Sequence, residues 1–577
     1  MMKNPDTEHY PLKPYLQKTR SAFMYAGAFS LCMNLVMLAL PLYSLQVLDR
    51  VLSSHSLETL ALLTLLTVVC LLVYTIFSVV RDILLNAIGE WLDIEISPKL
   101  FADAVSKSSI GISVNASQHQ RDLATIRGFI TSAAGTLLDA PWSVVYLLVM
   151  YMINPVLGFI TVVGLIALIG FGILNELFTR KIFEQSSKEQ IKAQIMADTA
   201  SRNSEAIESM GMMRNVLRVW EEHQGGARDY ARSGARRAGM IQAVSRFIRL
   251  VIQIAITGVG GYLALENELS VGGMIASSII AGRALAPFEN AIAIWKNWIA
   301  TRESYHRVNK ALLSGQAIGR GTVDLPEPEG RINVENLIFT PPNSAPIIKG
   351  VTFNLQPGQS LGIIGPSAAG KSTLAKLIVG LLPPNHGAAR LDGMETFKWS
   401  RENFGKYVGY MPQSVDMFQG TIKDNIARMD KNASIEAVIE AAKMAQCHEL
   451  ILRQPNGYET VVAPNLNNLS PGQRQRIGLA RALYGRPKFV VLDEPNSNLD
   501  GDGERALLMA LRSMKEAGIT FIVVAHRPSI VQNVDGLLVL KGGVIERFGA
   551  TADVLRAYQA DPENNPTQSK KSDEVSS

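Results

Sequence analysis

The segment Gly365–Thr373 constrains the fold of this chain more than any other part of it. It reads Gly-Pro-Ser-Ala-Ala-Gly-Lys-Ser-Thr and fits the pattern G-x-x-x-x-G-K-[ST] of phosphate-binding loops. The residues before it, Ser360–Ile364, are typical of a buried strand, and Leu374–Val379 after it begin a helical pattern. In such a strand–loop–helix unit, backbone N–H groups and the helix N-terminus face the phosphates. The segment therefore predicts an α/β nucleotide-binding domain.

Two more apolar segments end in side chains suited to nucleotide hydrolysis. Phe489–Glu494 is an apolar strand that ends in two carboxylates. We expect Asp493 to hold Mg²⁺ through water and Glu494 to polarise the attacking water. His526 follows the strand Thr520–Ala525, where it can contact the γ-phosphate.

Gln413 and the segment Leu469–Arg476 complete the set. Gln413 can reach Mg²⁺ or the attacking water, and Leu469–Arg476 reads Leu-Ser-Pro-Gly-Gln-Arg-Gln-Arg. Each piece alone has a common structural explanation, since a Val-Val-Leu-Asp-Glu strand is usually core and a single histidine is usually structural. Their joint occurrence in this order favours a nucleotide hydrolase.

With these motifs, residues 331–558 resemble an ATP-binding cassette (ABC) domain. The resemblance assigns six motifs in chain order: the Walker A loop Gly365–Thr373, the Q-loop Gln413, the signature Leu469–Gln473, Walker B Phe489–Glu494, the D-loop Asn498–Asp500 and the switch histidine His526.

The resemblance implies that ATP and Mg²⁺ are bound and that the chain forms a homodimer. In this family the signature binds the ATP that is held by the Walker A loop of the opposite domain, so two domains are needed for each site. The implied ATP-binding residues are Gly365, Pro366, Ser367, Ala368, Ala369, Gly370, Lys371, Ser372, Thr373, Ser470, Gly472 and Gln473. The implied Mg²⁺ residues are Ser372, Gln413 and Asp493, and the implied catalytic residues are Glu494, His526 and Gln413.

The chain departs from the family pattern in three places. Pro471 stands where the signature usually has its first glycine, and proline has no N–H to offer a phosphate. The segment Phe339–Asn343 has no tyrosine at the place where an aromatic ring usually stacks on adenine. The segment Thr460–Asn468 lacks the glutamate that is common before the signature of exporters.

The N-terminal half carries the apolar runs of a membrane domain. Leu60–Val80 has no charged residue and is long enough to cross a bilayer. Ala140–Asn175 is too long for one span, and Asn154-Pro155 reads as a turn that divides it into two. With Ala22–Val47, Leu250–Leu265 and Val271–Ile294, hydropathy predicts six spanning helices. The last of these is the weakest because Arg283 and Glu289 interrupt it.

Lysine and arginine gather in the N-terminal segment and in two long polar segments, roughly 82–127 and 180–243. The other connections are short and poor in cations, so the positive-inside rule places both termini and both long segments in the cytoplasm. This topology also explains the net charge of +5, so nucleic-acid binding is not expected.

The expected fold is an all-α six-helix membrane domain followed by an α/β P-loop ABC domain. The predicted boundaries are a cytoplasmic segment at 1–21, the membrane domain at 22–312, a linker at 313–330, the ABC domain at 331–558 and a disordered tail at 559–577. Both long polar segments read as helices. In exporters of this family such segments end in short coupling helices, for which Gln118–Thr125 and Asn203–Met210 are the candidates.

Three local segments resemble one branch of these exporters. Leu138–Ser143 is similar to the Asp-x-Pro-Trp stretch of type I secretion permeases. Glu205–Met212 and Leu479–Gly485 are similar to the branch that secretes proteases and lipases. The resemblance implies ATP-driven export of an unfolded polypeptide with an uncleaved C-terminal signal. It also implies a periplasmic adaptor, an outer-membrane channel and the inner membrane of a Gram-negative bacterium.

About 20 polar residues precede the first span, so we expect no cysteine-peptidase domain of the kind that trims leader peptides. The main alternative is an ABC lipid or drug exporter, which has the same ATPase but no adaptor. A second alternative is a regulatory or structural nucleotide-binding protein, because the signature is altered. A neighbouring gene for an adaptor would favour the secretion permease over the lipid or drug exporter. An ATPase assay would distinguish an active transporter from a regulatory or structural nucleotide-binding protein.

Overall fold

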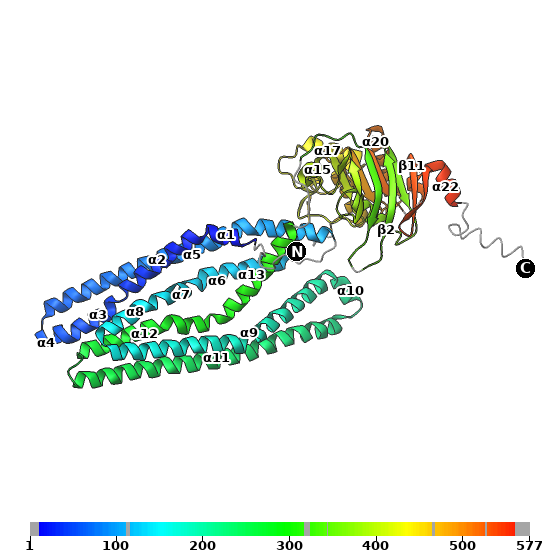
Figure 1. Ribbon diagram of the computed structural model, residues 1–577. Helices are drawn as coiled ribbons and strands as arrows, with labels where there is room; N and C mark the ends of the chain where they lie inside the picture. Colours follow the sequence, from blue (N-terminus) through cyan, green and yellow to red (C-terminus); the bar gives the residue numbers. More distant parts are fainter. Residues whose placement is uncertain are drawn as a thin grey trace, which may run out of the picture. The chain divides into compact units, whose positions relative to one another are not determined.

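A computed structural model describes residues 11–110, 116–316, 324–342, 344–463, 468–525 and 528–559 of the chain. It divides into two compact units at Ala317/Ile318. Among the described residues, the first unit is helical and the second contains all the strands (Figure 1). This confirms the predicted fold class.

The first unit contains the following helices: α1 (Lys13–Lys18), α2 (Arg20–Val36), α3 (Ala39–Gln46), a π-helical turn η1 (Val47–Val51), α4 (Leu52–Ser54), α5 (Leu57–Ser109), α6 (Ala116–Ser132), α7 (Ala134–Asp139), the 3₁₀ turn η2 (Ala140–Trp142), α8 (Ser143–Ile153), α9 (Pro155–Arg202), α10 (Ser204–Ser209), α11 (Met213–Leu265), α12 (Val271–Ala293) and α13 (Trp295–Gln316).

Six helical stretches of the described chain are long and apolar enough to cross a membrane. They are Arg20–Ser54, Leu57–Ser109, Ala134–Ile153, Pro155–Arg202, Met213–Leu265 and Val271–Ala293. The predicted turn is present, because Asn154 caps α9 by accepting a hydrogen bond from the Val156 N–H at 2.9 Å. Pro155 occupies the first helical position, where its missing N–H costs nothing. The number of predicted spans is therefore confirmed.

Three of these helices are much longer than a bilayer is thick. α5 and α11 have 53 residues each and α9 has 48. At 1.5 Å per residue they are about 70–80 Å long, against about 30 Å of hydrocarbon. The predicted long polar segments are thus helical continuations of the spans. α9 and α11 lie side by side and are joined by the short helix α10, as Figure 1 shows.

The sixth span is a continuous helix despite its charges. Glu289 of α12 is buried; it forms an ion pair with Arg249 of α11 at 2.6 Å and accepts a hydrogen bond from Arg246 Nε at 3.4 Å. Pairing removes the cost of an isolated charge inside a spanning helix. Hydropathy could not register this pairing, because the partners lie on another helix.

The second unit is built on a six-stranded sheet with the order β12-β11-β3-β10-β9-β6, in which all neighbours are parallel except β11 and β12. A four-stranded antiparallel sheet has the order β2-β1-β4-β5, and β7 pairs with β8. The strands are β1 (Ile332–Phe339), β2 (Ile348–Leu355), β3 (Ser360–Ile364), β4 (His386–Leu391), β5 (Met394–Glu395), β6 (Val408–Met411), β7 (Gly420–Thr421), β8 (Val461–Val462), β9 (Phe489–Asp493), β10 (Thr520–Val524), β11 (Gly536–Lys541) and β12 (Val544–Ala550).

The helices of this unit pack on the sheets and on one another. They are α14 (Lys371–Ile378), α15 (Arg401–Tyr407), α16 (Ile422–Ile426), α17 (Ile435–Met444), α18 (His448–Leu452), the 3₁₀ turn η3 (Gly457–Glu459), α19 (Pro471–Leu483), α20 (Gly501–Glu516), α21 (Pro528–Val531) and α22 (Thr551–Gln559). β3, β9 and β10 are buried along their whole length, as expected of parallel strands covered on both faces. This core fixes the strand ends that carry the site.

Candidate nucleotide site

The predicted nucleotide-binding residues lie where parallel strands of the six-stranded sheet end. The Walker A loop follows β3, Asp493 is the last residue of β9 and Gln413 lies just beyond β6. Since β3, β10, β9 and β6 are adjacent and parallel, their carboxyl ends meet at one edge of the sheet. This edge is where open α/β sheets bind ligands.

The Walker A backbone is fixed by two glycines that no other residue could replace without strain. Gly365 has φ +153°, and a Cβ built there would lie 2.0 Å from the carbonyl oxygen of Leu540. Gly370 has φ +99° and sits immediately before α14. The tight loop leaves the N-terminus of α14 free to face an anion.

Lys371 folds back over this loop. Its Nζ donates to the carbonyl oxygens of Gly365 at 2.8 Å and Pro366 at 2.9 Å. Burial lowers the pKa of Lys371, and the charges of Glu494 and Asp493 oppose that shift. The two carbonyl oxygens therefore hold the lysine amine at the mouth of the loop, where it can exchange them for phosphate oxygens.

Ser372 and Asp493 bring two hard oxygen donors together. Ser372 Oγ donates to Asp493 Oδ1 at 2.9 Å, although the two residues are far apart in the sequence. Burial raises the pKa of Asp493, while the Ser372 hydrogen bond lowers it. A buried carboxylate beside a hydroxyl matches the all-oxygen ligand set that Mg²⁺ prefers.

Gln413 and Glu494 meet at the same edge. Gln413 Nε2 donates to Glu494 Oε2 at 2.8 Å. Glu494 has φ +50°, a left-handed conformation that is uncommon for glutamate, and its N–H donates to the Val524 carbonyl at 3.0 Å. Strained backbone of this kind is typical of functional sites. The loop after β9 thus turns the Glu494 carboxylate away from the strand and toward Gln413.

The signature begins a helix. Ser470 caps α19 by accepting from the Gln473 N–H at 3.2 Å, and Gln473 Oε1 accepts from the Ser470 N–H at 2.9 Å. This capping box leaves the Ser470 hydroxyl proton free for a ligand. Pro471 occupies the first helical position, where proline suits the backbone but leaves one fewer N–H at the helix N-terminus.

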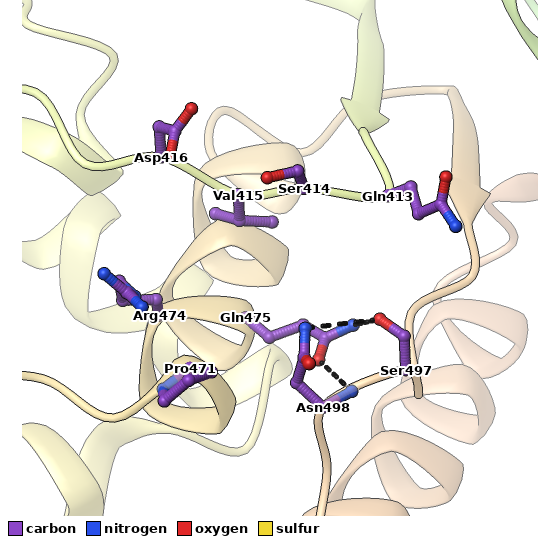
Figure 2. Close-up of a pocket in the computed structure, with 9 residues that line it drawn as sticks. All are labelled: Gln413, Ser414, Val415, Asp416, Pro471, Arg474, Gln475, Ser497 and Asn498. Carbon is purple, nitrogen blue, oxygen red and sulfur yellow. Dashed lines mark hydrogen bonds between the residues drawn. The ribbon is translucent and has the colours of Figure 1, made fainter. Parts of the chain in front are cut away.

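One cavity of about 320 Å³ joins three of the predicted motifs. Its lining residues, drawn in Figure 2, are Gln413, Ser414, Val415, Asp416, Pro471, Arg474, Gln475, Ser497 and Asn498. This cavity is thus lined, within a single protomer, by the Q-loop, the start of α19 and the segment after Walker B.

Sequence reasoning missed Gln475. This buried amide donates to the Glu494 carbonyl at 3.1 Å and to Ser497 Oγ at 3.3 Å, and it accepts from the Asn498 N–H at 3.1 Å. Figure 2 shows the contacts of Gln475 with Ser497 and Asn498, between α19 and the loop after β9. Gln475 therefore ties the signature helix to the backbone of Glu494. The only sequence signal was a glutamine inside a helix start, which is too common to single out.

Two predicted features lie outside the described residues. His526 is one, and residues 464–467 of the segment before the signature are the other. Residues 317–323 of the predicted linker and 560–577 of the predicted tail also lie outside them. α13 continues to Gln316, beyond the predicted boundary at 312. Asn203–Met210 contains the separate helix α10. Gln118–Thr125 instead begins the longer helix α6, whose Asp122 is buried against Arg307 of α13 at 2.6 Å.

Asp139, just before the third predicted span, and Arg283, inside the sixth, line one cavity of about 210 Å³ in the helical unit. Asp139 contacts Arg81 of α5 at 3.1 Å, Asn34 of α2 at 3.2 Å and the Ser30 hydroxyl. The two charges therefore share a polar cavity without pairing directly, which is one of the environments that membrane charges require.

Comparisons with known proteins agree with both units. The family described as "ABC transporter transmembrane region" matches residues 23–285, and "ABC transporter" matches 348–497. The type I secretion system ATP-binding protein PrsD of Rhizobium meliloti (strain 1021) is 36% identical over 557 residues, which cover 95% of each chain. The chain belongs to the ABC transporter family. Family membership and the similarity to PrsD show an ATPase whose ATP hydrolysis is coupled to transport.

Other relatives agree on the branch and the fold. The alpha-hemolysin translocation ATP-binding protein HlyB of Escherichia coli is 28% identical over 555 residues, covering 94% of this chain and 77% of that protein. A solved structure of a bacterial Atm1-family ABC exporter with ATP bound superposes with a TM-score of 0.82. It is 22% identical and covers 93% of this chain and 97% of that one, so it supports the fold alone. This ABC transporter is thus similar to type I secretion ATP-binding proteins.

Proposed function

We propose that this ABC transporter is the ATPase and permease of a type I secretion system. A homodimer in the inner membrane of a Gram-negative bacterium exports an unfolded polypeptide that carries an uncleaved C-terminal signal. A periplasmic adaptor and an outer-membrane channel complete the path. The observation that carries this proposal is the 36% identity to PrsD over 95% of both chains.

The site residues supply the chemistry of ATP hydrolysis. The loop Gly365–Thr373 cradles the phosphates through its backbone, and Lys371 adds a positive charge beside them. Ser372, Asp493 and Gln413 provide oxygen ligands for Mg²⁺, which supplies charge neutralisation between the phosphates when bound. Glu494 orients and polarises the attacking water, and His526 contacts the γ-phosphate. Ser470, Gly472 and Gln473 complete the ATP site of the partner subunit.

The described connections on the proposed periplasmic side support a separate adaptor. His55-Ser56, Asn154 and residues 266–270 are each only a few residues long. Segments of that length cannot cross the periplasm, so continuous export needs another protein. A lipid or drug exporter needs no such partner, and the relatives do not favour that alternative.

Deleting the gene is expected to remove one or a few proteins from the culture medium. The reason is that the C-terminal signal of the proposed cargo directs it to this transporter. Proteomics of the medium, compared with a strain complemented by the wild-type gene, measures this. An unchanged secretome together with altered membrane lipids or drug sensitivity would support the lipid or drug exporter.

Restoring an N–H at position 471 is expected to raise the ATPase rate. Pro471→Ala adds one backbone donor at the N-terminus of α19 and keeps a good helix former there. A single donor of this kind can contribute about 3 kcal/mol when it faces developing charge. Steady-state ATP hydrolysis of the purified variant measures the effect. Pro471→Gly, which adds the same N–H but loosens the helix start, is the matched control; a rate at or below wild type in both would show that Ser470 and Gly472 already suffice.

A further inference from the structure

One face of α11 carries a line of arginines. They are Arg214, Arg218, Arg228, Arg232, Arg236 and Arg246, and all six are exposed. At 3.6 residues per turn, their side chains fall within an arc of about 80° around the helix. We call these six residues the arginine stripe. Over 32 residues at 1.5 Å each, the stripe is about 48 Å long.

The stripe faces away from the neighbouring helix of its own protomer. α11 packs on α9 through Ala227 and Gly234: the Ala227 carbonyl accepts from Ser186 Oγ at 2.9 Å, and Gly234 abuts Phe183. These two positions lie about 140–160° around the helix from the centre of the stripe. Apart from Arg246, which contacts Glu289 of α12, the arginines of the stripe are therefore turned away from the packed side of α11.

Few of these arginines have an acidic partner. Arg246 contacts Glu289, and Arg228 lies 4.0 Å from Glu221. Among the described residues, no ion pair involves Arg214, Arg218, Arg232 or Arg236. Three exposed acidic residues, Glu221, Glu222 and Asp229, lie on or beside this face, so the six arginines outnumber them two to one. The surface is therefore net positive and favours an anionic ligand.

Membrane topology alone does not explain the stripe. The positive-inside rule concerns charges within about 15–20 residues of a span and sets no preference for one helix face. Arg214, Arg218 and Arg228 lie more than about 20 residues before the apolar part that begins near Leu250. An anionic lipid surface could not cover the whole stripe either. The headgroup layer is only about 5–8 Å deep on each side of the bilayer, whereas the stripe is about 48 Å long.

The same face continues into a groove in the spanning part of α11. Leu250, Gln253, Ile254 and Thr257 line a groove of about 540 Å³ together with Ser278 of α12. Gln253 Nε2 lies 3.4 Å from Ser278 Oγ, and Thr257 Oγ lies 3.3 Å from it. Polar side chains in a spanning helix are typical of a pathway rather than of a lipid-facing surface.

A second copy of this chain is a poorer match than an acidic polypeptide. The long helix α5 carries acidic residues, but three of them already contact cations of their own protomer: Asp82 with Arg81, Asp93 with Arg127 and Glu95 with Lys99. An extended polypeptide instead spans 48 Å with about 14 residues and can present carboxylates along that length.

We propose that the arginine stripe binds acidic stretches of the unfolded polypeptide cargo and leads them to the groove at Leu250–Thr257. The inference rests on the proposed function and names the substrate class as net acidic. Many weak contacts along the stripe suit transport, because a moving chain must be held and released repeatedly. Salt should weaken the interaction, since exposed charges are screened.

Binding of an acidic peptide to the full-length protein tests this. The probe is a fluorescent peptide of about 20 residues, long enough to cover the stripe, that repeats Asp, Gly and Ser. An analogue with Asn in place of Asp has the same length without the charge. The protein is held in nanodiscs of zwitterionic lipid, so lipid headgroups add no net charge, and binding is measured at low and physiological salt.

The test variant is Arg228→Gln, Arg232→Gln, Arg236→Gln. The matched control is Lys188→Gln, Arg202→Gln, Arg237→Gln, which removes the same charge from exposed positions outside the stripe on α9 and α11. Arg237 lies about 100° around the helix from Arg236. We expect the test variant to bind the Asp peptide at least about tenfold more weakly than wild type, as three exposed ion pairs allow. The control should match wild type, and the Asn analogue should bind weakly to all three.

Size-exclusion chromatography and circular dichroism verify that the test variant is folded. If it is not, Arg232→Gln alone should weaken binding about two- to threefold. Equal binding by the folded test variant, or by the Asn analogue, would overturn the proposal. So would a defect that appears only in anionic lipid, which would assign the stripe to the membrane, or a loss of the dimer, which would assign it to a second copy. Failure of the proposed function is separate, because it would appear as an unchanged secretome.

Discussion

Glu494→Gln is expected to bind ATP, remain dimeric with ATP and hydrolyse it at least ~10²-fold more slowly than wild type. The amide keeps the size of the side chain but cannot accept a proton from water, and general-base catalysis typically contributes ~10²–10⁴-fold. The structure also indicates why this substitution should slow hydrolysis without disturbing the fold of the site. Glu494 already contacts Gln413 at 2.8 Å, so the variant amide keeps a polar neighbour and the loop after β9 should keep its shape. ATPase rate, nucleotide affinity and dimer formation are measured on the purified protein.

Glu516→Gln is the matched control for this substitution. Glu516 is exposed at the end of α20, in the same domain but away from the strand ends. The Glu516→Gln variant should therefore hydrolyse ATP at the wild-type rate. If Glu494→Gln also hydrolysed ATP at the wild-type rate, Glu494 would not be the group that activates water. A loss of ATP affinity instead would show that the change had disturbed the Walker A loop.

The sequence predicted the parts of the site that depend on local order. The Walker A loop needs glycines at Gly365 and Gly370, and the structure shows why: both have positive φ, and Gly365 meets a backbone carbonyl at close range. Asp493 and Ser372 were predicted from separate motifs, and strand order brings their oxygens within 2.9 Å. Short motifs of this kind are readable because the backbone geometry they require admits few residue types.

Long-range pairing was harder to predict. Glu289 made the sixth span look weak, yet Arg246 and Arg249 on another helix neutralise it. Gln475 joins α19 to the backbone of Glu494, a contact between segments that only the fold brings together. Gln118–Thr125 has the polarity of a free amphipathic helix, but Asp122 within it is buried with Arg307. Hydropathy and composition describe each segment alone, so they cannot detect such partners.

The arginine stripe illustrates a different limit of prediction from the sequence. Its charges are visible in the sequence and agree with the predicted cytoplasmic location. Their alignment becomes meaningful only when Met213–Leu265 is known to be one uninterrupted helix and Gly234 is known to face α9. A break anywhere in that helix would have scattered the same residues over several faces.

Export of a passenger protein is the other large effect that we expect. The C-terminal segment of a protein that the deletion strain no longer secretes, fused to a passenger, should carry that passenger into the medium. ATP hydrolysis supplies the energy, so Glu494→Gln should abolish the export. The same passenger with the segment at its N-terminus should stay inside, because recognition is proposed to occur at the C-terminus.

The measurement is the fraction of passenger in the medium from four strains: deletion, wild type, Glu494→Gln and Glu516→Gln. The proposed type I secretion function predicts passenger in the medium of the wild-type and Glu516→Gln strains and none from the other two. Passenger that stays in the cells of all four strains, or that reaches the medium in the deletion strain, would contradict it.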